Sequence, residues 1–322
     1  MNQFVPLSAA ALPAIVAAGD ERAKLRFLEF FAVQIRNPNT RRAYLGDVEG
    51  FLTWCAGYRV HQLGEISPLH VASYIELLTR SRTAPTTKRC LAALRKLFDW
   101  LVTGQVVPSN PATSVRGPKY SQRQGKTPIL AADEARALLD SIDASTLVGL
   151  RDRAFIATML LTFARVSAVA GMKVEDLYLS ERRYWARLHE KGGKLHEMPC
   201  NHKLETYLVE WLEVSGLKDE PKAPLFPTIR RGTGNGAGEL TRTHLQQQNA
   251  YDAVRRHAAA AGMPNGIGNH SMRGTGLTSF LKNGGSLRKA QEMANHADLR
   301  TTQLYDRRKN AVTIEDVERT MI

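Results

Sequence analysis

Apolar residues recur every three to four positions along most of the first hundred residues, which is the pattern of helices that bury one face. The stretch "NTRRAYLGDVEGFLTWCAGY" follows this period with Thr40 as a candidate N-cap, and "SPLHVASYIELLTR" repeats it with Ser67 as cap and Pro68 in the first turn. In "TTKRCLAALRKLFDWLV" the apolar positions again fall on one stripe. These segments predict a small bundle made of helices.

The helical period breaks between residues 106 and 128, where prolines, glycines and cations replace it. Prolines stop helices and this segment has little to bury, so it predicts an extended basic linker. We therefore expect a flexible or loosely docked leader at 1–22, a helical domain at 23–108, the linker at 109–127 and a second domain at 128–322.

The second half of the chain mixes helical and strand-like patterns. "AADEARALLDSI" is helical, and "RYWARLHEKGGKLHEMPC" has two strand-like runs around a glycine pair, which predict a β-hairpin with Lys191 at its tip. From His202 onward the sequence is mostly helical, interrupted by "RRGTGNGAGEL". This insert lacks the lysine and the preceding strand of a phosphate-binding loop, so we interpret it as a flexible loop. The predicted fold class is mainly α with a small antiparallel β-sheet (α+β), in two domains.

One charge stands inside the apolar run "ATMLLTFARVSAVAGM", the guanidinium of Arg165. A buried and unpaired guanidinium costs several kcal/mol, so it needs an anion. The run could be a membrane span, or Arg165 could pair with a distant carboxylate or with an anionic substrate. We reject the span, because a central arginine costs roughly 2.5 to 3.5 kcal/mol on insertion and the small residues around it offset little of that. The other two interpretations stay open at this point.

The charge balance favours a polyanionic partner. The 322 residues include 44 Lys and Arg against 31 Asp and Glu, for a net charge of +13. A basic protein without such a partner is the alternative. The three cysteines are too few and too scattered for a disulfide framework or a paired zinc motif, which suits a reducing cytoplasm. The leader has no basic start and contains Pro13, which argues against a secretory signal.

Side chains that could act on a phosphate are spread over separate motifs of the second half. Taken alone, a tyrosine most often packs and a histidine is most often a satisfied surface or core residue. Together, their order and spacing make the chain, from about Ala23 onward, similar to the tyrosine recombinases or phage-type integrases. "NHSMRGTG" and "ANHADLRTTQLYDRR" complete the series, which consists of Arg165, Lys191, His270, Arg273, His296 and Tyr305.

The resemblance implies a helical, SAM-like core-binding domain followed by a catalytic domain, and the activity of a site-specific DNA recombinase (integrase) of mobile elements. Tyr305 would attack the scissile phosphate, giving a 3′-phosphotyrosyl link and a free 5′-hydroxyl. Arg165 and Arg273 would hold the non-bridging oxygens, and Lys191 would protonate the leaving oxygen. The resemblance implies no metal, no nucleotide and no other cofactor.

The implied site also includes two histidines, and two positions near it differ from the family's usual pattern. His270 would assist proton transfer at the nucleophile, and His296 would donate a hydrogen bond to the phosphate. Ala168 stands where the family commonly carries a carboxylate, so we expect Arg165 to be held by other groups or positioned less firmly. Asn295 replaces a usual glycine, which is the milder change because asparagine tolerates left-handed backbone geometry.

The resemblance also implies partners: double-stranded DNA recombination sites, bound by a homo-tetramer that is a monomer or weak oligomer when free. An accessory DNA-bending protein is compatible with this scheme, and no membrane partner is expected. The segment "TIEDVERTMI" predicts a helix that either bridges subunits or folds back on its own domain. A solvated helix face explains the cations of the first domain as well as DNA contact does. The candidates for DNA contact, which include one residue of the linker, are Thr40, Arg41, Arg42, Lys88, Arg89, Arg95 and Lys126.

Two other functions stay open. A type IB topoisomerase-like enzyme would share the nucleophile and the cationic pocket but act as a monomer on one duplex. A DNA-binding regulator whose catalysis has decayed would bind the site without cleaving it, and Ala168 is the feature that supports this alternative. In each case we expect a cytoplasmic protein.

Overall fold

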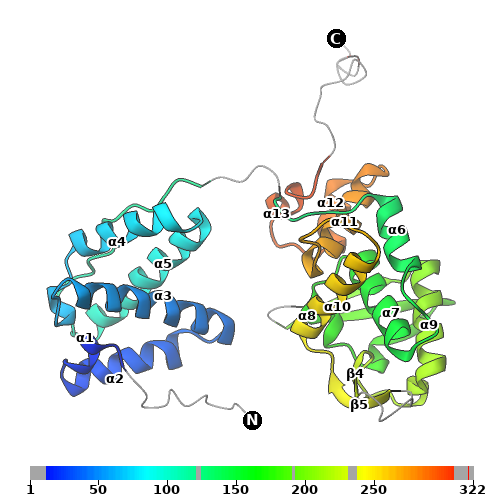
Figure 1. Cartoon of the computed structure of the whole chain (residues 1–322), viewed down its shortest axis with the longest axis horizontal. Helices are drawn as coiled ribbons and strands as arrows, with labels where there is room; N and C mark the ends of the chain where they lie inside the picture. Colours follow the sequence, from blue (N-terminus) through cyan, green and yellow to red (C-terminus); the bar gives the residue numbers. More distant parts are fainter. Residues whose placement is uncertain (1–11, 121–124, 191–192, 231–237, 308–317, 319–322) are drawn as a thin grey trace. The chain divides into compact units, whose positions relative to one another are not determined.

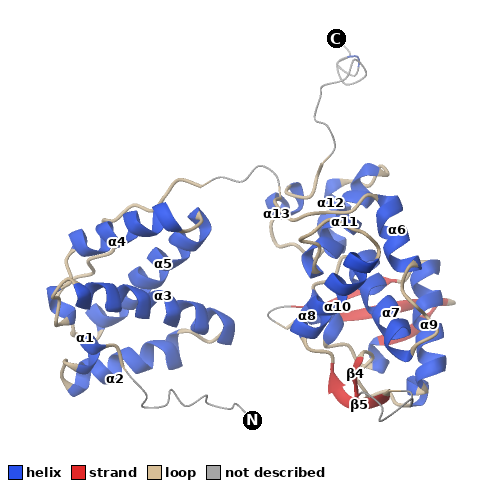
Figure 2. Cartoon of the chain, viewed as in Figure 1, coloured by secondary structure: helices blue, strands red, loops and turns tan. Residues whose placement is uncertain are grey.

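The computed structural model describes residues 12–120, 125–190, 193–230, 238–307 and 318. It forms two compact units, Met1–Ser121 and Gln122–Ile322 (Figure 1). Helices make up most of both units, and the described strands belong to the second unit (Figure 2). The fold is therefore mainly α with small antiparallel sheets, which confirms the predicted class. Among the described helices, none combines the length and apolar character needed to cross a bilayer.

The first unit is the predicted helical bundle, and its core is rich in aromatic residues. Phe27, Phe30, Phe31, Phe51 and Phe98 are all fully buried there. Its helices are α1 (Ala14–Ala17), α2 (Glu21–Glu29), α3 (Pro38–Gly57), α4 (Pro68–Ser81) and α5 (Ala84–Thr103), with a π-helical turn at Phe30–Gln34 and a 3-10 turn at Leu63–Glu65.

The cap predicted for α3 is wrong, whereas the one predicted for α4 is confirmed. Helix α3 begins at Pro38, and the Asn37 side chain accepts hydrogen bonds from the backbone N–H groups of Asn39 and Thr40. Asparagine is a stronger N-cap than threonine, and proline fits the first helical position, so this pair displaces Thr40 as the start. Ser67 precedes α4 as expected.

Parts of the predicted leader and linker pack on the bundle. In the leader, Ile15 and Val16 of α1 are 2% and 0% exposed. At the start of the linker, the Asn110 side chain donates to the Arg95 carbonyl at 2.9 Å and Ala112 is fully buried. These segments bury apolar side chains and form hydrogen bonds to backbone groups of the bundle. They are therefore packed against it, and not extended or loose as predicted.

The second unit is built around α7, which is buried on nearly all sides and packs against α9 and α11. That arrangement explains its lack of a helical period, because a helix surrounded by protein has no polar face. The helices of the unit are α6 (Ala132–Asp140), α7 (Leu147–Thr162), α8 (Val166–Ala170), α9 (His202–Ser215), α10 (Gln247–Ala260), α11 (Asn269–Lys282), α12 (Leu287–Met293) and α13 (Leu299–Gln303), with 3-10 turns at Val174–Asp176 and Leu217–Asp219.

Two antiparallel sheets complete the second unit. In the first sheet, β1 (Leu177–Ser180), β2 (Arg183–Glu190) and β3 (Lys194–Pro199) lie in that order. The predicted β2–β3 hairpin is confirmed: Glu190 pairs with Lys194, and Gly193 has a positive φ of 76° that favours glycine. Its tip, residues 191–192, lies outside the described residues.

The second sheet was not predicted. Strands β4 (Pro227–Arg230) and β5 (Glu239–His244) flank the glycine-rich insert, so both ends of the predicted loop belong to strands. Ile229 lies opposite Leu240, and the hydroxyls of Thr228 and Thr241 are 2.6 Å apart. The runs are too short and too polar to stand out as strands in the sequence. Residues 231–237 between them, and the predicted C-terminal helix apart from Glu318, lie outside the described residues.

Candidate active site

Arg165 lies at a break between two helices. Helix α7 ends at Thr162, Phe163 adopts a left-handed conformation with φ 57°, and Arg165 is the N-cap of α8 with extended backbone. Its side chain keeps 34% of its surface exposed. The apolar run therefore supplies a rigid, buried base that presents the guanidinium at a helix end.

The anion that Arg165 contacts is Glu190, the last residue of β2. Arg165 Nη1 donates to Glu190 Oε2 at 2.5 Å, and the Glu190 side chain is 2% exposed. Of the interpretations left open for Arg165, the ion pair with a distant carboxylate is thus present in this structure. No sequence motif singled out Glu190, although an acidic residue beside the predicted Lys191 was the available signal.

Arg273 lies deeper, on α11, with 2% of its surface exposed. It donates hydrogen bonds to the backbone carbonyls of Phe163 and Ala294, the second at 2.6 Å. Burial and the nearby charge of Arg165 lower the pKa of Arg273 to about 10. The guanidinium therefore stays charged at neutral pH, and the two carbonyls fix its plane.

The charges of the same two arginines act on both predicted histidines, of which His270 is exposed. On α11, burial and then the charges of Arg273 and Arg165 lower the pKa of His270. His296 follows α12 and is 7% exposed, and the same causes lower its pKa to about 3. Asn295 before it has φ 47°, a left-handed conformation that asparagine tolerates.

Tyr305 packs against the helix that carries Arg273. A Cβ added to Gly274 would lie 3.2 Å from Tyr305 Cε1, so the ring packs closely against this glycine. The Tyr305 ring stacks on His296, with 6.0 Å between centroids and 14° between planes. Thr278 on α11 donates its hydroxyl to the Tyr305 carbonyl at 2.9 Å.

The end of the linker holds the segment that carries Tyr305. The Gly125 N–H donates to the Leu304 carbonyl at 2.8 Å. Arg307 Nη2 in turn donates to the carbonyls of Gly125 and Thr127 at 3.1 and 2.7 Å. The residues on both sides of the tyrosine are therefore fixed to the chain that enters this unit.

Arg165, His270, Arg273, His296 and Tyr305 thus converge from the α7–α8 break, α11 and the segment around α13. Lys191, the remaining predicted catalytic residue, lies outside the described residues. The β2–β3 hairpin contacts the cluster through another residue. The imidazole Nε2 of His196 on β3 is 3.0 Å from the carbonyl of Met293, three residues before His296.

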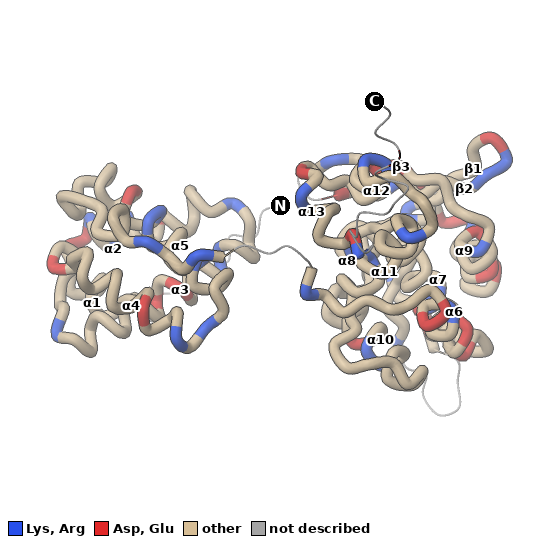
Figure 3. Tube along the Cα trace, turned by 90° about the horizontal axis from the view of Figure 1, so that it is seen from above, with Lys and Arg blue, Asp and Glu red and all other residues tan. Residues whose placement is uncertain are grey.

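The cations predicted to contact DNA fall into two groups in the structure. In the first group the side chain is held by the protein: Arg41 donates to the Ile35 carbonyl, Arg95 to the Ala112 and Val115 carbonyls, and Arg89 to both carboxylate oxygens of Asp47. In the second group, Arg42 and Lys88 are exposed and pair with none of the described residues, and Lys126 is also exposed. The backbone N–H of Thr40 donates to Asn37. Lys and Arg positions occur on both units (Figure 3).

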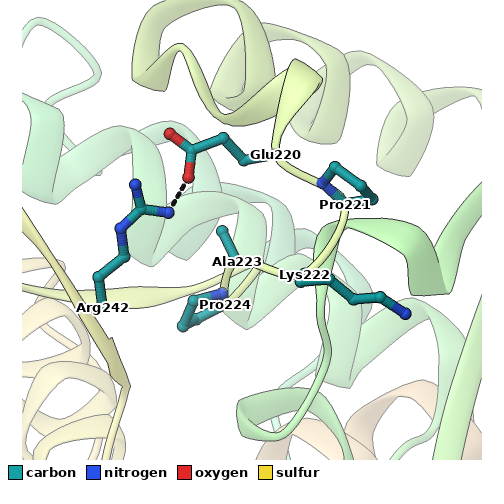
Figure 4. A pocket seen from close by; sticks show the side chains of 6 residues that line it. All are labelled: Glu220, Pro221, Lys222, Ala223, Pro224 and Arg242. Carbon is teal, nitrogen blue, oxygen red and sulfur yellow. Dashed lines mark hydrogen bonds and ion pairs between the residues drawn. The ribbon is translucent and has the colours of Figure 1, made fainter.

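Two hollows of the second unit contain none of the predicted catalytic residues. One is bordered by the Glu220–Arg242 ion pair and by the segment Pro221 to Pro224 (Figure 4). Glu220 pairs with Arg242, and Lys222 pairs with Glu175 outside the hollow, so each of its charged groups already has a partner. Among the described residues, no group of three His, Cys, Asp or Glu side chains could hold a metal ion.

Comparisons with known proteins match both units. Residues 128–311 match the family model described as "Phage integrase family", and residues 26–105 match "Phage integrase, N-terminal SAM-like domain". The chain is 31% identical over 277 residues to tyrosine recombinase XerC of Mycobacterium sp. (strain KMS), covering 84% of this chain and 88% of the relative. It is 28% identical over 287 residues to tyrosine recombinase XerD of Listeria monocytogenes serotype 4b (strain F2365), covering 87% and 91%.

Solved structures share the fold. The XerH site-specific recombinase in a post-cleavage complex with a palindromic difH substrate has a TM-score of 0.71 at 19% identity, covering 95% of this chain and 97% of that one. A lambda integrase tetramer bound to a Holliday junction has a TM-score of 0.67 at 16% identity, covering 90% and 79%.

Proposed function

Because the chain belongs to the phage integrase family of tyrosine recombinases, we propose that it cleaves and rejoins duplex DNA at specific sites, with Tyr305 as the nucleophile. In this proposal residues 23–108 form the core-binding domain, 109–127 the linker and 128–322 the catalytic domain. The observation that carries the proposal is the convergence of two arginines and two histidines beside the Tyr305 ring.

The proposed reaction exchanges one phosphodiester for another. The Tyr305 oxygen attacks the phosphorus, the bond from phosphorus to the 5′-oxygen breaks, and a 3′-phosphotyrosyl link forms. Lys191 gives a proton to the departing 5′-oxygen. In the reverse step a 5′-hydroxyl, from the same or a second duplex, attacks the link and releases Tyr305. The number of phosphodiester-type bonds is unchanged, so the cycle consumes no nucleotide.

The arginines supply the electrostatic part of the reaction. Charge grows on the non-bridging oxygens as phosphorus becomes five-coordinate, and planar guanidinium groups match those oxygens. Arg273 uses N–H groups on the backbone carbonyls of Phe163 and Ala294, and its remaining donors are fixed in direction. Because these donors are oriented before DNA binds, they lower the barrier without reorganising during the reaction.

In the proposal, His296 forms a hydrogen bond to the phosphate and His270 takes the proton of the phenol. His296 Nδ1 is 2.8 Å from the Thr302 hydroxyl. In the tautomer whose Nδ1 accepts from Thr302, Nε2 carries the proton and can donate to a phosphate oxygen. Desolvation and the charges of Arg273 and Arg165 lower the pKa of His270, which favours the neutral imidazole needed to take a proton from Tyr305.

Binding and assembly follow from charge and from the family. The exposed cations of both domains would contact phosphates, while groove contacts from the helices near Arg41 and Lys88 would select the sequence. Strand exchange needs two duplexes, so we propose a homo-tetramer on DNA, bridged by residues 313–322, and a monomer or weak oligomer in the absence of DNA. The tetrameric assembly of lambda integrase on a Holliday junction supports this arrangement.

The test is to map covalent adducts on DNA. The wild-type chain and Y305F are expressed in cells that carry the DNA of the source organism, and denatured protein–DNA adducts are captured and sequenced. We expect adducts at discrete sites with wild type and none with Y305F. Specific binding without adducts would identify the decayed regulator. Relaxation of supercoils that is independent of sequence would favour the topoisomerase-like enzyme.

A further inference from the structure

The Arg165–Glu190 ion pair brings together parts of the chain that no motif connects. Arg165 caps α8, and Glu190 ends β2, on which α8 packs. The carboxylate is almost fully buried while the guanidinium stays one-third exposed. The pair is therefore anchored on the protein side and open on the side where a substrate would bind.

Glu190 also compensates for a repulsion inside the site. Arg165 and Arg273 are close enough that the charge of Arg165 lowers the pKa of Arg273, whereas the charge of Glu190 raises it. Without DNA, two guanidinium groups with no carboxylate would push each other apart. Ala168 cannot supply that carboxylate, although it lies in the turn after Arg165 and is buried.

The second oxygen of Glu190 strengthens the case for a role beyond packing. Its Oε1 atom is buried and makes no hydrogen bond to any described residue. Buried carboxylate oxygens are nearly always paired, because an unpaired one loses its hydration without compensation. A protein that needed Glu190 for stability alone would gain by satisfying both oxygens or by replacing the residue.

We propose that Glu190 is the positioning residue for Arg165: it holds the guanidinium in the cleavage site before DNA arrives, with its remaining N–H groups directed at the scissile phosphate. Glu190 takes the place of the carboxylate that position 168 lacks. Because it directly precedes Lys191, it also ties the end of the hairpin that carries the proposed general acid to the arginine. This inference rests on the proposed function.

The experiment measures single-turnover cleavage of a nicked duplex, built on a mapped site, by the full chain at saturating protein. E190Q keeps the size of the side chain and removes its charge. We expect cleavage to slow by about 10²-fold while DNA affinity changes by less than about threefold, because orientation rather than binding is lost. E197Q is the matched control: Glu197 is an exposed carboxylate on the same hairpin that pairs with Arg187, and its loss should leave cleavage unchanged.

A double-mutant cycle separates positioning from a structural role. If Glu190 acts through Arg165, E190Q should cause no further loss in the R165A background, whereas a structural defect would slow R165A again. E190D keeps the charge but moves it by one methylene, and it replaces E190Q in the cycle should E190Q melt at a much lower temperature.

Cleavage by E190Q at the wild-type rate, or an equal loss in both backgrounds, would overturn the proposal. A wild-type chain that forms no Tyr305 adduct would instead refute the proposed function itself.

Discussion

The arginines of the two units make similar contacts, to backbone carbonyls or to one carboxylate, but they are grouped differently. In the first unit, Arg41 and Arg95 donate to backbone carbonyls on the edge of the bundle and Arg89 pairs with Asp47, while Arg42 stays exposed. In the second unit, Arg165 and Arg273 converge so closely that one lowers the pKa of the other. Dispersed cations can attract a polyanion by their number, whereas converging ones bind a single phosphate by their geometry.

The largest expected effect tests that difference with the same substitution in both units. R165K keeps the charge but loses the planar fork, and we expect cleavage to slow by about 10² to 10³-fold. R42K should leave both DNA affinity and cleavage within a factor of about two, because an exposed cation acts as a point charge. Single-turnover cleavage and filter binding measure the two quantities, and equal losses for the two variants would break the comparison.

The next largest effect is expected at Gly125, the linker residue that donates its N–H to the Leu304 carbonyl beside Tyr305. A Cβ at Gly125 would lie 2.8 Å from the Leu304 carbonyl oxygen, so G125A must displace the backbone beside Tyr305. We expect cleavage to slow by roughly 10-fold or more, because the nucleophile is misplaced. G46A in α3 is the control, since a Cβ there meets no atom within 4 Å. A G125A variant as active as G46A would show that the pairing does not position the nucleophile.

A smaller effect is expected for a cation of the first unit. The plot of log affinity against log salt concentration has a negative slope. K88A should make it shallower by about 0.9, because one lost phosphate contact releases about one counterion fewer. Cleavage at saturating protein should not change, since Lys88 is not one of the proposed catalytic residues. Titrations at several salt concentrations measure the slope, and a slope equal to that of wild type would remove Lys88 from the DNA surface.

The smallest expected effect concerns the protonation of His296, whose imidazole should not titrate between pH 8 and pH 5. Its folded-state pKa of about 3 lies below the ordinary value near 6.5, so the free protein keeps this imidazole neutral from pH 8 to pH 5. The unfolded chain binds the proton near pH 6.5 and the folded chain does not, so this group costs stability as pH falls below about 6.5. NMR of the imidazole measures the pKa, and protonation near pH 6.5 would place His296 in a solvated site.

Much of the second unit could be predicted because its candidate catalytic residues and its hairpin belong to short sequence motifs. His270 and Arg273 share a helix, and the hairpin follows from two strand-like runs around glycines. A carboxylate partner for Arg165 was one of the interpretations left open, but its identity as Glu190 could not be predicted, because a helix cap and a strand end meet through the fold and not through sequence spacing.

The same limit applies to the linker and the leader. Their composition predicts extended or loose chain, yet Ile15 and Val16 are buried and Gly125 pairs with Leu304. Local patterns report propensity, whereas these contacts depend on partners far away in the chain. The cap of α3 failed for a local reason, because Asn37 competes with Thr40 for the same role and wins.

The most direct test of the central claim is to locate the covalent link itself. A nicked duplex carrying a mapped site is incubated with the full chain, the adduct is digested, and the modified peptide is sequenced by mass spectrometry. We predict a nucleotide joined through its 3′-phosphate to the peptide that contains Tyr305. Tight binding without an adduct, or an adduct on any other side chain, would contradict the account.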